Sequence, residues 1–158
     1  MPVVYLGLGS SLGCWASHLE YANARLTSLG PTRASAWYQT DPWGLPSAEP
    51  FLNGVVSLHT TLGPLELLDA TQAFERESGR VDRPDCARTL DIDILMYGVQ
   101  VLSGVRVTLP HPRLAQRAFV LVPLAEIAPD LRHPVTGLAV RDMLRRVVEF
   151  GVRRLPAA

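Results

Sequence analysis

The stretch LDIDILMYG, residues 90–98, carries the pattern from which the rest of the fold is predicted. Apolar and polar side chains alternate along it, which is typical of a β-strand with one face in a core. The face covered by helices would hold Ile92, Ile94 and Met96. Asp91 and Asp93 would share the opposite face, about 6.6 Å apart along the strand. The strand therefore predicts a sheet with one covered face and one open face.

Patterns elsewhere predict an α+β fold. Strands are expected at 3–9, 34–39 and 53–60, a hairpin arm at 99–109, and helices from Trp15 to Gly30, from Pro64 to near Gly79 and at 138–148. The order β-α-β-β-α-β predicts a ferredoxin-like α/β sandwich, a mainly antiparallel sheet with helices on one face. The other face would be free for ligands, with flexible catalytic loops at 40–50 and 80–88. Since no repeat or long linker interrupts it, we expect residues 1–158 to form a single domain.

Composition excludes several classes of function. All 15 basic residues are arginine, and they balance 15 acidic residues. Without lysine, neither a Walker-type phosphate loop nor Schiff-base chemistry can operate. The pI of about 6.9 argues against a general nucleic-acid binder. The two cysteines form no disulfide framework or zinc motif, and no signal peptide or spanning segment is visible. We therefore expect a cytoplasmic protein without nucleic-acid or membrane partners.

Asp91 and Asp93 are the strongest chemical signal. Two carboxylates at this spacing repel each other unless a cation lies between them, and Mg²⁺ fits such a pair. Solvation, or pairing with Arg80 and Arg88, would explain a bare pair equally well, so the flanking residues decide. Further donors follow the pair in the sequence, namely Arg106, Thr108, His111, Arg113 and Arg117. This pattern predicts nucleotide-dependent phosphoryl transfer.

Two other features leave alternatives open. His111 lies between two prolines, where it could donate to a phosphate or serve only as a turn residue. Gln72 and Glu75 are three positions apart on a predicted helix, so they could face the site together or lie on a plain helix surface.

Together these stretches resemble the 6-hydroxymethyl-7,8-dihydropterin pyrophosphokinase family over nearly the whole chain. The segments that carry the resemblance are YLGLGSSLG (5–13), YQTDPWG (38–44), FLNGVV (51–56), ESGRV (77–81), RTLDIDIL (88–95) and LPHPRLAQRAFVLVPLAEIAP (109–129). The resemblance implies a ferredoxin-like fold and a role in folate biosynthesis. It also implies transfer of the terminal pyrophosphoryl group of ATP to the hydroxymethyl oxygen of the pterin, with AMP released and two Mg²⁺ ions required.

The resemblance also implies roles for individual residues. Asp91 and Asp93 would be the magnesium ligands. The catalytic set would add Arg80, Arg88, His111 and Arg117, which would also bind ATP, together with Gln72, Glu75, Ile94, Arg106 and Thr108. The pterin site would comprise Thr40, Pro42, Trp43, Gly44, Phe51, Asn53 and Phe119. Two phenyl rings can sandwich a flat heteroaromatic ring, and an amide can read its polar edge, although both phenylalanines could also be ordinary core.

The loop before the aspartates departs from the family pattern. Where RWGPR is usual, the chain has Asp85, Cys86, Ala87 and Arg88, so the tryptophan that helps to close over the pterin is missing. Asp82 stands where a second loop arginine is expected, and Arg83 is a displaced substitute. We expect an active monomeric enzyme with a differently closing lid. A non-catalytic pterin- or nucleotide-binding module of the same fold is the alternative, and a sugar-nucleotide transferase is disfavoured by the short chain.

Overall fold

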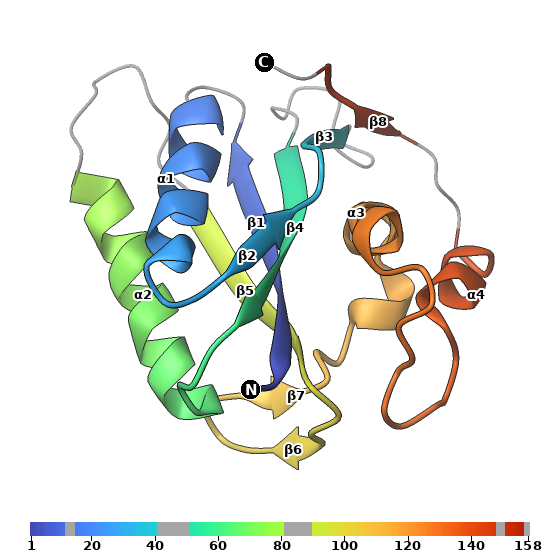
Figure 1. Ribbon diagram of the computed structural model, residues 1–158. Coiled ribbons are helices and arrows are strands. Elements are labelled where there is room, and N and C mark those ends of the chain that lie inside the picture. Colours follow the sequence, from blue (N-terminus) through green and yellow to red (C-terminus); the bar gives the residue numbers. More distant parts are fainter. Residues whose placement is uncertain (12–14, 41–50, 81–89, 148–150, 157–158) are drawn as a thin grey trace.

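The computed structural model describes residues 1–11, 15–40, 51–80, 90–147 and 151–156. Three long antiparallel strands dominate the sheet (Figure 1), with β1 (Val3–Ser11) between β4 (Phe51–His59) and β5 (Leu90–Tyr97). The short strands β2 (Thr32–Ala34) and β3 (Tyr38–Thr40) both pair with β4, and β8 (Val152–Arg154) pairs with the outer edge of β3. A separate hairpin is formed by β6 (Leu102–Ser103) and β7 (Thr108–Leu109).

Two long helices, α1 (Trp15–Thr27) and α2 (Pro64–Arg80), lie on one face of the sheet (Figure 1). In α1, Leu19, Ala22 and Leu26 recur at helical spacing and are fully buried, as the sequence predicts. They pack against alternate residues of the strands, which include Leu6, Leu8, Ile92 and Ile94. Burying one such leucine contributes about 1.5–3 kcal/mol. The predicted mainly antiparallel sheet is confirmed, and α1 and α2 cover one of its faces.

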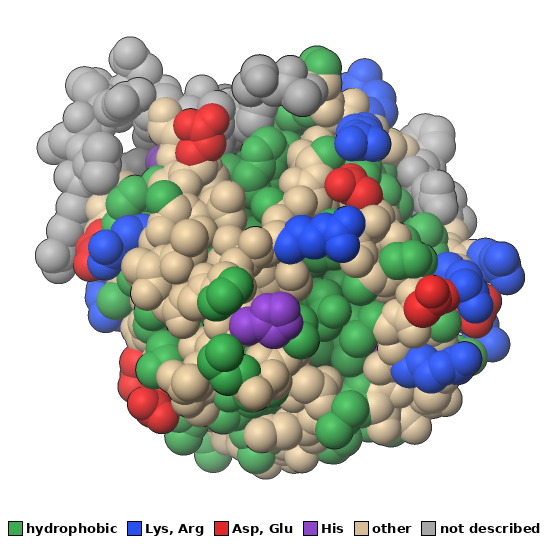
Figure 2. Space-filling model, viewed as in Figure 1, with side chains coloured by type: hydrophobic (Ala, Val, Ile, Leu, Met, Phe, Trp, Pro, Cys, Tyr) green, Lys and Arg blue, Asp and Glu red, His purple; other side chains and the backbone are tan. Residues whose placement is uncertain are grey.

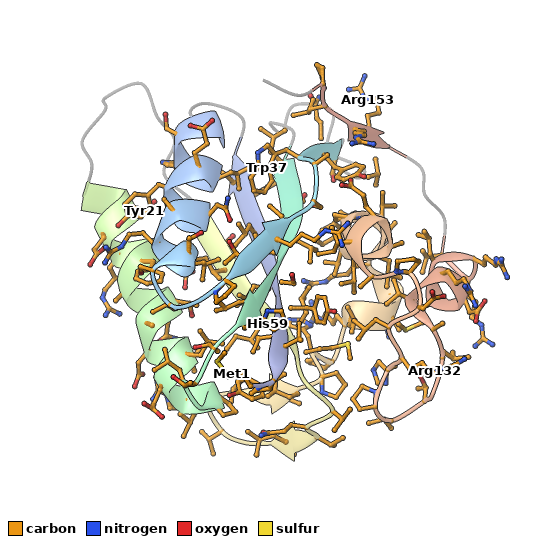
Figure 3. All side chains as sticks on the ribbon, in the orientation of Figure 1. Met1, Tyr21, Trp37, His59, Arg132 and Arg153 are labelled. Atoms are coloured by element: carbon orange, nitrogen blue, oxygen red, sulfur yellow. The ribbon has the colours of Figure 1, made fainter. Side chains whose placement is uncertain are left out.

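Polar contacts join the two helices to each other. Tyr21 points from α1 toward α2 (Figure 3), where its hydroxyl donates to Glu77 Oε2 at 2.6 Å. Arg25 lies 3.4 Å from the same carboxylate, and its guanidinium is 4.9 Å from the centre of the Phe74 ring. These contacts fix α2 beside α1, and hence the position of the α2 side chains that reach the site.

The opposite face is not wholly free, contrary to the prediction. A 3₁₀ turn (Leu114–Gln116), α3 (Ala118–Ile127) and α4 (Val140–Leu144) lie on that side of the sheet (Figure 1). They form a second core with Val55, Leu95 and Met96 of the sheet. Asn53, Gly9 and Asp91, which form the next row across the three long strands, do not belong to this core. In that row Asp91 is exposed, Asn53 is half-buried and Gly9 is buried, so the exposed part of the face, as far as the structure describes it, lies on the β5 side.

Several predicted elements need correction. The expected strand at 34–39 is two short strands, because residues 35–37 belong to neither: at residue 35 the side-chain hydroxyl accepts the Val55 N–H, at 2.9 Å. The Trp37 ring then lies on Gly54, where a Cβ would be 2.2 Å from it. The expected helix at 138–148 is shortened to α4, while α3 and β8 were not predicted.

Charged side chains near α4 are mutually paired. Figure 2 shows acidic and basic side chains interspersed over α4 and the loop before it. Arg141 pairs with Asp130, and Arg145 lies 3.2 Å from Asp142. This part of the arginine-rich half is therefore a solvated surface. Among the described residues, no helix is long and apolar enough to cross a membrane.

Candidate active site

The aspartates lie in the first half of β5. Asp91 and Asp93 are exposed, while Leu90, Ile92 and Ile94 are buried, so the predicted alternation is confirmed as far as Ile94. Met96 was predicted on the same face as Ile92 and Ile94, but it lies in the second core, because the register shifts beyond Ile94. The register places Asn53, Gly9 and Asp91 in one row across β4, β1 and β5. The central strand has only a glycine in this row, so no β1 side chain separates the amide of β4 from the carboxylate of β5.

A third carboxylate comes from α2. Burial is the main cause that raises the pKa of Glu75, and the charges of Asp91 and Asp93 raise it further. A hydrogen bond with the Ile92 backbone opposes this rise and holds Glu75 against the residue between the two aspartates. The pKa of Asp91 is also raised, by burial and then by Asp93. Glu75 thus lies close to both aspartates, and its implied contact with ATP stays a prediction.

This cluster of negative charge fits a divalent cation. Among the described residues, no arginine forms an ion pair with Asp91 or Asp93. The alternative pairing partners, Arg88 and the side chain of Arg80, lie outside the described part. Within that part, no three acidic, histidine or cysteine side chains could jointly hold a metal ion. A cation here would therefore take further oxygens from substrate or water, as Mg²⁺ does in phosphoryl-transfer sites.

His111 and Arg117 lie near Asp93. The His111 N–H donates to the Leu95 carbonyl at 2.8 Å, which fixes the loop against β5. Its ring Nδ1 accepts the Arg113 N–H at 3.1 Å, so the neutral ring carries its proton on Nε2. Burial is the main cause that lowers the pKa of His111; Asp93 raises it, while Arg117 and Arg113 lower it further. His111 is therefore a neutral donor near Asp93.

Arg117 also contacts an aromatic ring. Its guanidinium lies 5.5 Å from the centre of the Phe119 ring, within range of a cation–π interaction. Arg117 precedes the first residue of α3, and Phe119 is the second residue of that helix. Pro123 has no N–H, so the Phe119 carbonyl receives no helical hydrogen bond from it. The polyphosphate and pterin residues implied by the family resemblance thus meet at the start of α3.

The pterin residues of the sheet lie on β3 and β4. Phe51 and Asn53 are two positions apart in β4 and so share a face, and Phe51 is 45% exposed, which is unusual for a large apolar side chain. The Thr40 hydroxyl donates to Asn53 Oδ1 at 3.3 Å. Pro42, Trp43 and Gly44 lie outside the described residues, as does the altered loop at 82–87.

The nucleotide residues are only partly brought together. Arg106 Nη2 lies 2.6 Å from Asp69 Oδ1 and 3.4 Å from Gln72 Oε1, so it joins the hairpin loop to α2. Sequence reasoning missed Asp69, although it is three positions before Gln72 on the same helix. Thr108 is exposed in β7. The side chain of Ile94 is 5% exposed and lies in the core with residues of α1 and α2, on the face opposite the aspartates. Its implied contact with ATP stays a prediction.

Comparison with known proteins identifies the family. The family model described as 7,8-dihydro-6-hydroxymethylpterin-pyrophosphokinase matches residues 5–129. The chain belongs to this pyrophosphokinase family. A relative from Pseudomonas aeruginosa, named 2-amino-4-hydroxy-6-hydroxymethyldihydropteridine pyrophosphokinase, is 44% identical over 159 residues, which cover 98% of each chain. A relative of the same name from Porphyromonas gingivalis is 44% identical over 141 residues, 85% of this chain and 95% of the relative.

Solved structures agree on the fold. The crystal structure of an HPPK-DHPS in complex with substrates matches 92% of this chain with a TM-score of 0.72 at 13% identity. The matched part is 43% of that larger protein. The wild-type Plasmodium falciparum HPPK-DHPS with pteroate matches with a TM-score of 0.73, over 42% of its chain. At 13% identity these matches show that the chain shares the ferredoxin-like fold. They say nothing about the part of the HPPK-DHPS chains that this chain does not match.

The family establishes the reaction. The chain is a diphosphokinase of folate biosynthesis, which transfers a pyrophosphoryl group from ATP to 6-hydroxymethyl-7,8-dihydropterin. This confirms the predicted enzyme class and both substrates, and it favours the active enzyme over the non-catalytic module. The contribution of each residue does not follow from the family match, so it has to be argued from the site.

Proposed function

We propose that the reaction requires Mg²⁺ held by Asp91 and Asp93, with two ions bound together with ATP. The observation that supports this most directly is the pair of exposed carboxylates on one strand face, which no arginine of the described part neutralises. When bound, Mg²⁺ would neutralise the charge of the polyphosphate and help to align it. Glu75 would support the site from α2, where its bond with Ile92 fixes the strand between the aspartates.

The cationic and neutral donors would hold the polyphosphate. Arg117 would donate from its guanidinium, and the neutral His111 from Nε2, because its Nδ1 already accepts the Arg113 N–H. Arg80 and Arg88 complete this set in the proposal. The pterin hydroxymethyl oxygen bonds to the β-phosphorus of ATP as the bond to the α,β-bridging oxygen breaks. AMP then leaves with that oxygen, and the hydroxyl proton is released. Alignment of the reacting groups supplies much of the rate enhancement.

The remaining residues would bind the rest of each substrate. Phe51 and Phe119 would stack on the two faces of the pterin, while Asn53, Thr40 and the backbone of 42–44 would read its polar edge. Gln72, Arg106 and Thr108 would contact the nucleotide. In this proposal the chain acts as a single-domain monomer in the cytoplasm. Sedimentation of the purified protein at micromolar concentration would give the mass of a dimer if the monomer proposal is wrong.

The first experiment is a product assay. Protein, Mg·ATP and 6-hydroxymethyl-7,8-dihydropterin should yield AMP and pterin diphosphate in equal amounts, and production of ADP would contradict the reaction. Asp93→Asn should abolish turnover without unfolding the protein, because it removes a charged ligand from an exposed position. Asp130→Asn is the matched control, since it removes a carboxylate paired with Arg141 on the surface near α4. Equal activity of the two variants would refute the proposed metal site.

A further inference from the structure

Gly9 occupies a position where any side chain would touch the proposed pterin-reading amide. It lies in β1, opposite Asn53 of β4 and Asp91 of β5. A Cβ at residue 9 would be 3.1 Å from Asn53 Nδ2, which is closer than ordinary van der Waals contact between such atoms. The second atom near this Cβ would be the Leu52 carbonyl oxygen, at 4.0 Å. The amide of Asn53 therefore lies against the bare backbone of the central strand.

The other end of the same amide is also held. Asn53 Oδ1 accepts a hydrogen bond from the Thr40 hydroxyl at 3.3 Å, on the β3 side of β4. The amide thus spans from β3 toward β1, with its oxygen at one strand and its nitrogen at the other. Little room is left for the side chain to shift along the sheet. The rest of the amide therefore keeps a fixed place relative to the row that ends at Asp91.

We propose that Gly9 is a positioning residue for the pterin: by lacking a side chain it lets the Asn53 amide lie against β1, at the place where it meets the substrate. The inference rests on the proposed role of Asn53. An alanine at residue 9 would push the nitrogen end of the amide away by a few tenths of an ångström. A hydrogen bond that depends on direction weakens under such a shift, so pterin binding should suffer while nucleotide binding does not.

The chain offers a matched control in Gly7. It lies two residues earlier in β1, so it shares the same face of the strand and has Val55 and Asp93 as register partners. The three atoms nearest to a Cβ there all belong to the Leu95 side chain, the closest at 3.4 Å, which is an ordinary contact. Gly7→Ala therefore adds the same methyl group and the same change in strand propensity without touching Asn53.

The test measures kcat and the KM of each substrate for the wild type and four variants: Gly9→Ala, Gly7→Ala, Asn53→Ala and the double variant with Gly9→Ala and Asn53→Ala. Gly9→Ala should raise the pterin KM about tenfold, the cost of one weakened hydrogen bond, and leave the ATP KM within about twofold. Gly7→Ala should leave both unchanged. In the Asn53→Ala background, Gly9→Ala should add less than about twofold, because the group that it displaces is gone.

Two results would overturn the inference. One is an unchanged pterin KM in Gly9→Ala. The other is a full tenfold effect of Gly9→Ala in the Asn53→Ala background, which would mean that the new methyl group obstructs the substrate directly. If Gly9→Ala does not fold, the double variant decides, because removal of the Asn53 amide relieves the contact with the new methyl group and should restore folding; a double variant that also fails to fold, while Asn53→Ala folds, counts against the inference. A normal pterin KM in Asn53→Ala would instead refute the proposed role of Asn53.

Discussion

Glu126 offers the sharpest test of how the pterin half of the site is held. This glutamate of α3 accepts the Ala36 N–H at 3.0 Å through Oε2, and the Tyr38 hydroxyl at 2.5 Å through Oε1. Burial, the hydrogen bond to Glu126 and its charge raise the pKa of Tyr38 to about 12, so the phenol stays a donor at neutral pH. Tyr38 is the register partner of Asn53. Glu126 thus ties α3 to the strand beside the proposed pterin site.

The expected cost of Glu126→Ala follows from these contacts. Two donors, the Ala36 N–H and the Tyr38 hydroxyl, lose a charged acceptor, and each such bond contributes about 1.5–3 kcal/mol when protected from water. Because Glu126 is exposed, water can replace part of the lost hydrogen bonding. We therefore expect Glu126→Ala to lower the free energy of unfolding by about 2–3 kcal/mol in total. For a chain of 158 residues, that lowers the thermal midpoint by about 4–12 °C.

Thermal unfolding followed by circular dichroism measures this change. Glu20→Ala, which removes an exposed glutamate from α1, is the control and should leave the midpoint unchanged. Glu126→Ala should also raise the pterin KM more than the ATP KM, since the strand that it releases pairs with the segment containing Asn53. A midpoint within about 1 °C of that of Glu20→Ala would refute the reasoning, and so would equal changes in both KM values.

Three further predictions concern other parts of the molecule. Asp69→Asn removes the exposed ion pair with Arg106 and should raise the ATP KM about two- to fivefold while changing stability by less than about 1 kcal/mol; a melting curve and kinetics at low and high salt measure both. Burial lowers the pKa of His18, so the unfolded chain takes up the proton first as the pH falls below about 6.5, and stability is lost there. His18→Gln should flatten the fall of the thermal midpoint between about pH 7.5 and 5.5, and a fall as steep as that of the wild type would contradict this. Chelation of divalent cations should stop AMP release and leave the thermal midpoint unchanged, and added Mg²⁺ should restore the activity.

The parts of the fold that repeat one pattern could be predicted from the sequence. Alternation along residues 90–97 placed Asp91 and Asp93 on an exposed face, and a helical stripe placed Leu19 and Leu26 in the core. In both cases one side of the element faces water and the other faces the core, so the polarity of each side chain indicates the face on which it lies. The helices α1 and α2 and the three long strands follow from this contrast.

Elements without such a contrast were missed. The sequence of α3, AFVLVPLAEI, is apolar on nearly all sides, because the helix packs between the sheet and α4, and it contains Pro123. The three-residue strand β8 exists only because the edge of β3 is available to pair with it. Local propensity carries little information in either case, since tertiary contacts decide the structure.

In the site, too, some features could be predicted from the sequence and others could not. Family motifs supplied the residue types, including the aspartates and Asn53. The contacts that orient them join distant positions: Glu75 with the Ile92 backbone, and Asp69 with Arg106. Such pairs depend on how α2 lies against β5 and the hairpin, which no local pattern in one sequence records.

The pairing of β3 with β8 bears on the order in which the protein folds during synthesis. The three long strands and the helices α1 and α2 are all complete once the ribosome has made residue 97, whereas the outer edge of β3 stays unpaired until residues 152–154 emerge. That edge can pair only after the intervening chain has been synthesised. Since β3 contains Tyr38 and Thr40, the pterin half of the site is completed last. A nascent chain could therefore assemble its aspartate strand well before it can recognise a pterin.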